Sequence, residues 1–281
     1  MVVLEKSWRS APPSGPMFRA ARVKKGRDMS PTKYATQIPG EFDIAGRSYI
    51  VSGAGRGIGK GIARVLAESG AKVLATSLTD KYMPEVAADL EQAGHPIKTM
   101  AADATSGNDM AKVVAGALNH FGRLDGLVNC VGDAISKPVV PMPDGAGSEG
   151  PLSDEEWRFV IDVNLTEAFV GCRAVGEYFL RKGSGRVINI AGFAAGRGNA
   201  NLAAYSAAKA GLVRMTQVLA LEWAPYGVNI NAIAPGLFPD PVTNGEEFLE
   251  AADRDAADGK DTTSSRRPVE GGWAVDTLLA V

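Results

Sequence analysis

Tyr205 and Lys209 lie four residues apart in the segment AAYSAAKAGL, within a helix predicted over residues 201–224. Residues four apart on a helix share a face, so the Lys209 ammonium can lie beside the Tyr205 phenol and favour its ionised form. A phenol with an ordinary pKa near ~10 then becomes a usable proton donor or acceptor close to neutrality. Two surface residues without a shared function could have the same spacing. A second motif is therefore needed to decide whether this pair is catalytic.

A glycine-rich turn about 150 residues upstream supplies that motif, in the run YIVSGAGRGIGKGIA over residues 49–63. A strand pattern precedes the turn and an amphipathic helix follows it. Gly53, Gly57 and Gly59 would let the backbone approach a pyrophosphate, and the helix N-terminus would supply unpaired N–H groups and a partial positive charge. Such turns are frequent in α/β proteins, but after the first strand of a βαβ series this one indicates a dinucleotide site.

Strands and helices must position these residues. From residue 47 onward, short apolar runs alternate with helical patterns, as in a parallel sheet covered on both faces. We predict a single-domain α/β fold, a Rossmann-type doubly wound parallel sheet that binds ligands beyond the carboxyl ends of its strands. The predicted strands are residues 48–52, 72–76, 97–101, 126–131, 186–190 and 228–233. The predicted helices are residues 57–69, 83–93, 107–121, 154–180 and 201–224, with Ser153 and Glu156 as a capping box for the fourth.

Composition restricts the kind of partner. The 281 residues are 45% hydrophobic with a net charge of -2, enough for a large core but without the overall basic field that nucleic acid requires. No apolar run reaches the ~18 residues of a membrane span. Two cysteines and two histidines are too few and too dispersed for a metal site or a disulfide framework, so a reducing cytoplasm fits best. We expect a small-molecule substrate, and no metal.

Two segments depart from the alternating pattern. Residues 1–40 are basic and contain several prolines, so we expect either a disordered extension or an upstream start ahead of Met29, with a transit peptide as the alternative. The domain then spans residues 41–281. Residues 138–152 form a long Pro- and Gly-rich loop just beyond the fourth strand, and either a lid over the substrate or a tolerated insertion would account for it.

Over roughly residues 45–243 the chain resembles the short-chain dehydrogenase/reductase family. The resemblance rests on the G-x-x-x-G-x-G spacing around Ile58, Asp103, the segment from Asn129 to Gly132, Asn164, Tyr205 with Lys209, and Pro235 with Gly236. It implies that NAD(P) exchanges a hydride with the substrate while Tyr205 exchanges a proton with the substrate oxygen. It also implies that Lys209 binds the nicotinamide ribose and lowers the tyrosine pKa, and that Asn164 connects Lys209 to solvent through water. A helix-interior amide without a catalytic role is the alternative for Asn164.

The same resemblance places Asp103 at the adenine and the Pro235-Gly236 turn beside the nicotinamide, with Asn129 and Gly132 in the cofactor-binding set. It also implies a homodimer or homotetramer formed through the long helices. Cofactor choice depends on the end of the second strand, where an acidic residue would favour NAD. Ser77 stands there, and Arg56 in the glycine turn could pair with the 2′-phosphate of NADP. We therefore predict NADP, with NAD as the alternative and Arg56 then pointing to solvent.

The chain departs from the family pattern in two places. Thirteen residues before Tyr205, where the family usually has its catalytic serine, stands Gly192. Losing one such donor typically costs ~10²–10³ in rate. Candidate replacement donors are Asn199, Asn201, Ser136 and Asp133. The second departure is the chain's end at Val281, where the family usually continues into a seventh strand; we expect a truncated record or an abbreviated edge strand.

Three functions remain open at this point. The first is interconversion of a carbonyl and a secondary alcohol on an apolar or cyclic substrate, with Tyr205 as acid and base. The second is reduction of a conjugated double bond, for which a missing serine matters less. The third is a dinucleotide-binding sensor or scaffold without turnover, which the replaced serine and the short C-terminus would allow.

Overall fold

The computed structural model describes residues 43–92, 97–143 and 150–236. Its strands are β1 (Ser48–Ser52), β2 (Lys72–Ser77), β3 (Ile97–Ala101), β4 (Gly126–Asn129), β5 (Gly185–Ile190) and β6 (Val228–Ile233). Its longer helices are α2 (Gly57–Glu68), α3 (Met83–Gln92), α4 (Gly107–Phe121), α5 (Asp154–Ile161), α6 (Glu167–Lys182) and α7 (Ala203–Trp223). The predictions for the N-terminal extension, for the middle of the 138–152 loop and for the C-terminal edge lie outside the described residues.

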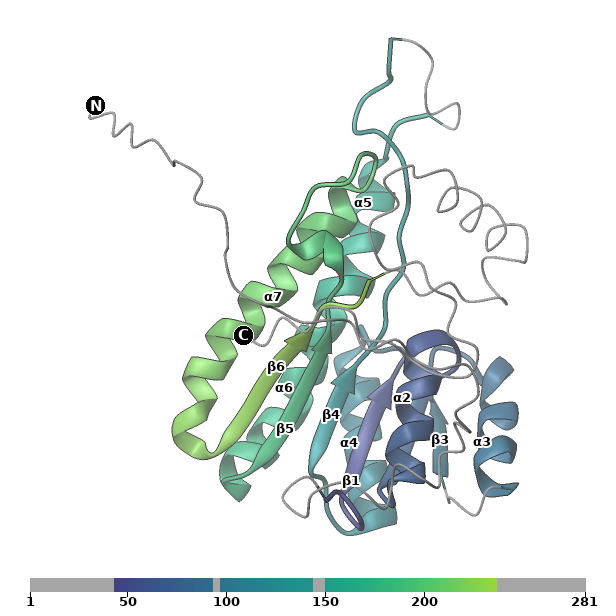
Figure 1. The fold of residues 1–281 in the computed structure, drawn as a ribbon, viewed down its shortest axis with the longest axis vertical. Coiled ribbons are helices and arrows are strands. Elements are labelled where there is room, and N and C mark those ends of the chain that lie inside the picture. Colours follow the sequence, from purple (N-terminus) through teal and green to yellow (C-terminus); the bar gives the residue numbers. More distant parts are fainter. Residues whose placement is uncertain (1–42, 93–96, 144–149, 237–281) are drawn as a thin grey trace, which may run out of the picture.

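The six strands form one parallel sheet in the order β3-β2-β1-β4-β5-β6. The chain starts in the middle of the sheet, runs to one edge, and then returns to the centre to build the other half (Figure 1). Ser52 at the end of β1 pairs with Asn129 at the end of β4. These two carboxyl ends flank the point where the strand order reverses, which is where doubly wound sheets bind ligands. The predicted fold class is confirmed.

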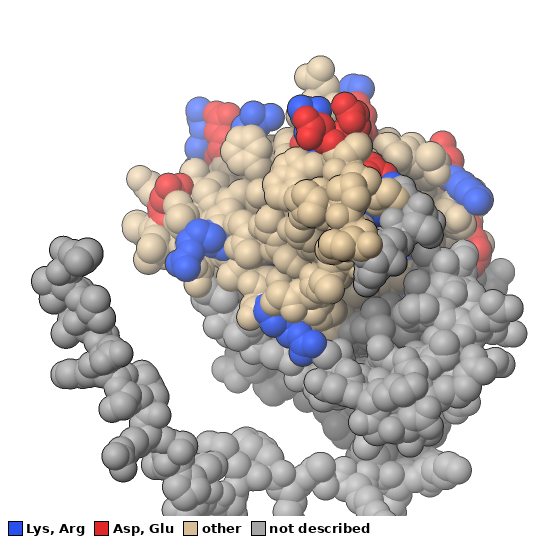
Figure 2. Space-filling view, turned by 90° about the horizontal axis from the view of Figure 1, so that it is seen from above, with Lys and Arg blue, Asp and Glu red and all other residues tan. Residues whose placement is uncertain are grey.

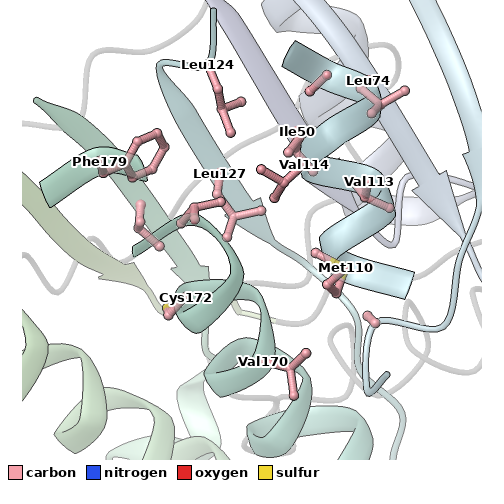
Figure 3. Close-up of a cluster of buried hydrophobic side chains, with 14 of the residues drawn as sticks. Ile50, Leu74, Met110, Val113, Val114, Leu124, Leu127, Val170, Cys172 and Phe179 are labelled. Atoms are coloured by element: carbon pink, nitrogen blue, oxygen red, sulfur yellow. The ribbon is translucent and has the colours of Figure 1, made fainter. Parts of the chain in front are cut away.

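Two layers of helices bury the sheet, and the alternation of side chains along each strand decides which layer a residue faces. In β1, Ile50 packs into the cluster formed with α4 and α6, whereas Val51 packs into the cluster formed with α2 and α3. Figure 3 shows the first cluster, to which Met110 of α4, Leu127 of β4 and Phe179 of α6 all belong. All three side chains are at most 1% exposed. Full burial contributes roughly 1.5–3 kcal/mol for each such residue, so this layer holds the sheet rigidly beneath the site.

The segment predicted as one helix over residues 154–180 is divided in the structure. Its start is as predicted, because Ser153 Oγ accepts from the Glu156 N–H at 3.1 Å and Glu156 Oε2 accepts from the Ser153 N–H at 2.9 Å. A π-helical turn, η3 (Asp162–Thr166), then separates α5 from α6. The Asn164 side chain donates to the Val160 carbonyl at 2.8 Å, the acceptor that a regular α-helix would give to the Asn164 backbone. Because the side chain occupies this carbonyl, the backbone hydrogen bonds change there from the α-helical to the wider π-helical spacing.

Strand β4 ends at Asn129, two residues before the predicted end at Val131. The Cys130 N–H donates to the side-chain oxygen of Ser52 at 3.3 Å rather than to a strand carbonyl. The chain therefore leaves the ladder at the level where β1 turns into the glycine-rich loop. Both loops begin at the same height on the sheet, which brings the cofactor turn and the residues after β4 together.

The loop after β4 is attached at two places through Lys137. Its N–H donates to the Asn201 carbonyl in the loop before α7 at 2.9 Å. Its ammonium pairs with Glu156 Oε1 at 2.5 Å, and Glu156 also caps α5. One lysine thus ties together three segments above the carboxyl ends of the strands. None of the helices in the described part of the chain is long and apolar enough to cross a bilayer.

Candidate active site

The glycine turn joins β1 to α2 and presses against the end of β4. Gly53 has a φ of +71°, and a Cβ there would lie 2.7 Å from the Cys130 carbonyl oxygen, so a side chain at this position would collide with backbone. A Cβ on Gly59 would collide with the Gly53 carbonyl oxygen. Gly57, with a φ of +54°, opens α2, whose first turn carries no acidic residue. This close-packed backbone and the helix N-terminus fit a dinucleotide pyrophosphate.

The residues predicted for the adenosine half lie along the same edge of the sheet. Ser77 ends β2, and its Oγ lies 2.8 Å from where a Cβ on Gly55 would be, so it borders the glycine turn. Asp103 follows β3, and its Oδ1 accepts from the N–H and the hydroxyl of Thr105 at 2.8 and 2.7 Å. Arg56 is exposed at the start of α2. The glycine turn, the end of β2 and the segment after β3 thus lie at the carboxyl ends of three neighbouring parallel strands.

Tyr205 and Lys209 lie on the first turns of α7, and the helix buries the lysine almost completely. Lys209 is 3% exposed, and its Nζ donates to the Ile190 carbonyl at the end of β5 at 2.9 Å. The same Nζ lies 5.8 Å from the centroid of the Tyr205 ring. The hydrogen bond to the strand end fixes the ammonium next to the half-buried phenol. The shared helix face that the spacing predicts is present.

Asn164 is fully buried in the π-helical turn and faces the same space as Lys209. Its Nδ2 donates to the carbonyls of Asp133 and Val160 at 2.6 and 2.8 Å, whereas its Oδ1 has no hydrogen-bond partner among the described residues. A Cβ on Gly132 would lie 2.8 Å from Asn164 Oδ1 and 3.3 Å from Lys209 Nζ. The two atoms therefore converge beside Gly132. A buried acceptor and an ammonium so placed can share a bridging water.

A comparison with protein families identifies the group to which this arrangement belongs. The model of the short chain dehydrogenases matches residues 47–247. The chain belongs to the short-chain dehydrogenases. It is 35% identical over 216 residues to the short-chain reductase protein NovJ of Streptomyces niveus, covering 77% of this chain and 78% of that protein. It is 35% identical over 209 residues to a 3-oxoacyl-[acyl-carrier-protein] reductase of Synechocystis, covering 72% of this chain and 79% of that protein.

A solved dehydrogenase structure shows the same architecture. The structure is described as a putative NAD(P)-dependent gluconate 5-dehydrogenase from Beutenbergia cavernae with bound NADP, and it superposes with a TM-score of 0.66 at 39% identity. The match covers 78% of this chain and 82% of that one. The protein is accordingly an NAD(P)-dependent oxidoreductase, as the sequence resemblance implied.

In this short-chain dehydrogenase, Gly192 borders the phenol of Tyr205. A Cβ on Gly192 would lie 3.0 Å from Tyr205 Oη, and the backbone there is extended with φ 174° and ψ 161°. A serine could adopt this conformation and would present its hydroxyl at the phenol. Of the candidate replacement donors, Asp133 is engaged locally, because its Oδ1 accepts from the Ala134 N–H at 2.8 Å. The backbone carbonyl of Asn201 accepts a hydrogen bond from the Lys137 N–H.

The acidity of Tyr205 differs from the sequence-based expectation. Burial raises the pKa of the Tyr205 phenol, whereas the helix spacing predicted a lowering by Lys209. The lysine lies over the ring and directs its proton to Ile190 rather than to Oη. Burial also lowers the pKa of Lys209, an effect that the neighbouring Glu167 opposes. The four-residue spacing predicts that the two side chains are neighbours, but it carries no information on how far burial removes water from each of them.

The remaining predicted residues occupy different surroundings. The Asn129 side chain is 1% exposed and donates to Asn189 Oδ1 at 2.8 Å, so it faces the protein interior. Pro235 is buried after β6, and its carbonyl accepts from the Phe193 N–H at 3.1 Å, which places the Pro235-Gly236 turn next to the Gly192 segment. Ile58 is half-buried at the start of α2.

Sequence reasoning missed one charged residue of the site, Glu167. It begins α6, is 1% exposed, and lies close enough to Lys209 and Cys130 to interact with both electrostatically. The available signal was an acidic residue beside Ala168 and Val170 in a helix whose neighbouring positions are apolar, directly after the Asn164 turn. Such a position is usually occupied by a nonpolar residue, because an uncompensated buried carboxylate is costly.

Proposed function

We propose that this protein interconverts a carbonyl and a secondary alcohol with NADP(H), using Tyr205 as the general acid and base. The observation that carries the proposal is the convergence of three groups above the sheet. They are the Tyr205 phenol, the Lys209 ammonium fixed to Ile190, and the Asn164 Oδ1, which has no partner within the described part of the chain. They lie beyond the carboxyl ends of β4 and β5, on the same edge as the glycine turn. A proton donor, a cation and a buried acceptor beside a nucleotide cradle are what carbonyl reduction requires.

In the reductive direction, bound NADPH supplies the hydride. Tyr205 donates its phenolic proton to the oxygen of the carbonyl as charge develops there. Lys209 places a positive charge 5.8 Å from the centroid of the Tyr205 ring, where it would stabilise the phenolate that remains after the proton is given up. Asn164 accepts a hydrogen bond through Oδ1 and supports a water-borne path by which a proton returns through Lys209 to the phenol. Oxidation of the alcohol runs the same steps in reverse.

NADP is the proposed cofactor for two reasons. Ser77 ends β2 beside the glycine turn, so no carboxylate at that position binds the ribose hydroxyls as in NAD-preferring folds. Arg56 is exposed at the start of α2, within the turn that would surround the phosphates, and a guanidinium is suited to a 2′-phosphate. The gluconate dehydrogenase structure with bound NADP supports the same choice.

The surface above the site suggests the type of substrate and assembly. Viewed from above, the described surface is largely uncharged, with acidic and basic residues mainly around its edges (Figure 2). A surface with few charges favours an uncharged substrate, and we propose one that is apolar or cyclic and of moderate size. Large hydrophobic side chains are exposed on three helices: Trp157 and Phe159 of α5, Phe169 of α6, and Val218 and Leu221 of α7. We propose that they form the interface of a homodimer or homotetramer.

Both cysteines are free thiols, in keeping with the cytoplasm.

Gly192 favours a second candidate function, reduction of a conjugated double bond. In that reaction charge develops away from the carbon that accepts the hydride, so a hydroxyl at position 192 is less important. The space beside Tyr205 Oη that a serine side chain would fill is also available to a larger substrate. The two functions share the cofactor site and Tyr205, and they differ in which substrates are consumed.

The test is a fluorescence titration of the full chain with NADPH and NADH, followed by ketones and enoyl thioesters assayed by loss of reduced cofactor. We expect tighter binding of NADPH and turnover of ketones. Tyr205→Phe should abolish turnover while leaving the NADPH dissociation constant within about twofold, because the phenol contacts the substrate rather than the nucleotide. Turnover of enoyl thioesters alone would favour the second function, and binding without turnover would refute both enzymatic proposals in favour of a sensor or scaffold.

A further inference from the structure

Within the described residues, two buried side-chain hydrogen bonds join α7 to β5, and the first belongs to the site above. Near the start of the helix, Lys209 Nζ donates to the Ile190 carbonyl at 2.9 Å. Two turns further along, Thr216 Oγ1 accepts from the side-chain amide of Asn189 at 2.9 Å. Residues seven apart on a helix lie on one face, and Asn189 immediately precedes Ile190 in the strand. Lys209 and Thr216 therefore bind consecutive residues of β5.

The second bond is the end of a buried chain of hydrogen bonds that crosses three elements. Asn129 of β4 donates through Nδ2 to Asn189 Oδ1 at 2.8 Å, and Asn189 Nδ2 in turn donates to Thr216. The Thr216 hydroxyl gives its own proton to the Leu212 carbonyl, one turn earlier in α7, at 2.8 Å. Because that proton is used within the helix, the hydroxyl oxygen faces Asn189 as an acceptor. The side chains of Asn129, Asn189 and Thr216 are at most 1% exposed.

The apolar contacts of α7 define its position along the helix axis less sharply. Leu212 lies between Lys209 and Thr216 and is fully buried. The other buried members of its cluster are Ala168, Ala191 and Ala234. Burial of such small apolar groups is non-directional, so it holds the helix against the sheet without fixing how far along the sheet it lies. A hydrogen bond is directional and keeps its two heavy atoms within about 2.7–3.2 Å, so the bond from Asn189 to Thr216 does fix that position.

We propose that Thr216 is a positioning residue, which sets the axial position of α7 on β5 by binding Asn189. That position keeps Lys209 on the Ile190 carbonyl and the Tyr205 phenol at the reacting oxygen. The inference rests on the proposed function, because Thr216 is fully buried two turns from Lys209 and acts on the reaction only through the helix. Misplacing a catalytic group by about 1 Å can cost ~10² in rate.

The experiment replaces Thr216 by valine in the full chain, which keeps the shape of the side chain and removes the hydroxyl. The Asn189 amide then loses its acceptor, and α7 is free to shift along β5. Assayed well below the melting temperature of the variant, kcat for ketone reduction should fall roughly tenfold or more. Thr216→Ser keeps the hydroxyl and should hold kcat within about twofold of the unchanged protein.

Val113→Ala is the matched control for a general loss of stability. It removes methyl groups from a fully buried side chain of α4, within the cluster shown in Figure 3. It should lower Tm and leave kcat unchanged at the same temperature. A loss of kcat confined to the Thr216 variants therefore reports the position of α7 and not the stability of the fold.

A second measurement needs no turnover, so it separates failure of this inference from failure of the proposed function. Heteronuclear NMR of protein labelled at its lysine nitrogens detects the Lys209 ammonium, because a buried and hydrogen-bonded ammonium exchanges slowly with water. Lys209→Arg assigns its signal. We expect the signal to shift or broaden in Thr216→Val and to stay in place in Thr216→Ser. The same shift in a protein that reduces no substrate would support the positioning role while the proposed function fails.

A third variant covers the case in which the valine variant does not fold. Thr216→Cys leaves a weak acceptor in place of the hydroxyl, and it should change kcat and the Lys209 signal in the same direction. The proposal is overturned if the replacement keeps kcat within about twofold, if the Lys209 signal does not move, or if Val113→Ala loses as much activity.

Discussion

Replacing Gly192 by serine should make this enzyme a faster carbonyl reductase. The glycine is at the position where the family resemblance predicts a serine hydroxyl, and its backbone is already extended, with φ 174° and ψ 161°. An L-residue adopts that conformation without strain. The added Cβ would lie 3.0 Å from Tyr205 Oη. The new hydroxyl would thus reach the space in which the substrate oxygen must meet the phenol.

The expected magnitude follows from two opposing effects. One hydrogen-bond donor aimed at a developing oxyanion is typically worth ~10²–10³ in rate. The 3.0 Å contact is tighter than a normal Cβ contact, so the phenol must move by a few tenths of an ångström, which costs part of that gain. We therefore expect kcat/KM for ketones to rise roughly 10- to 100-fold.

The assay is steady-state loss of NADPH with a ketone that the unchanged enzyme reduces slowly. Gly192→Ala is the matched control, because it adds the same Cβ contact without the hydroxyl and should equal or fall below the unchanged rate. The NADPH dissociation constant should stay the same in both variants. If serine and alanine behave alike, the hydroxyl contributes nothing, and either another group already polarises the carbonyl or the natural reaction is not carbonyl reduction.

Three other outcomes can be checked independently. Ser77→Asp should shift the NADPH-to-NADH affinity ratio toward NADH by about 10- to 100-fold, since a carboxylate there would repel a 2′-phosphate; an unchanged ratio in fluorescence titrations would remove Ser77 from the discriminating set. Hydrogen bonds from Arg123, Lys182 and the Ser48 N–H outweigh the burial of Asp125 and hold its pKa below its usual range, so Asp125→Asn should lower Tm by roughly 2–6 °C at pH 7. That stabilisation exists above the ordinary carboxyl pKa and is lost as pH falls through the lowered one, so the Tm difference should shrink below pH ~4. Leu221→Lys, at a side chain that is 80% exposed, should reduce the oligomer seen by light scattering, and an unchanged mass would place the interface elsewhere.

The fold was predictable from sequence because each strand and helix carries its own period. Strands β1, β3 and β6 have the bounds that were predicted, and β2 begins as predicted and ends one residue later. They could be predicted because an apolar run in a parallel sheet is buried on both faces. What was missed depends on single tertiary contacts. The division of residues 154–182 by the π-helical turn follows from one side-chain bond of Asn164, and the early end of β4 follows from the Ser52 hydroxyl. No periodicity encodes either contact.

The candidate site was predictable in its membership and less so in its electrostatics. Tyr205 and Lys209 share a helix face as their spacing predicted, and Asn164 lies beside Lys209, as the family resemblance implied. The direction of the Tyr205 pKa was wrong, because helix geometry says which groups are neighbours and not how much water surrounds them. Glu167 was missed for the same reason. Its position looks like any helix residue until the fold buries it.

The attachment of Lys137 has a consequence for selectivity. Its backbone N–H binds the segment before α7 and its ammonium binds Glu156, which caps α5. One residue therefore joins two segments that would form walls of the proposed substrate entrance. A substrate that is slightly too wide cannot push one wall aside without also loosening the start of the helix that leads to Asn164. Discrimination by size would then be felt in the rate of proton transfer as well as in affinity, and a poor fit at the entrance would slow chemistry several residues away.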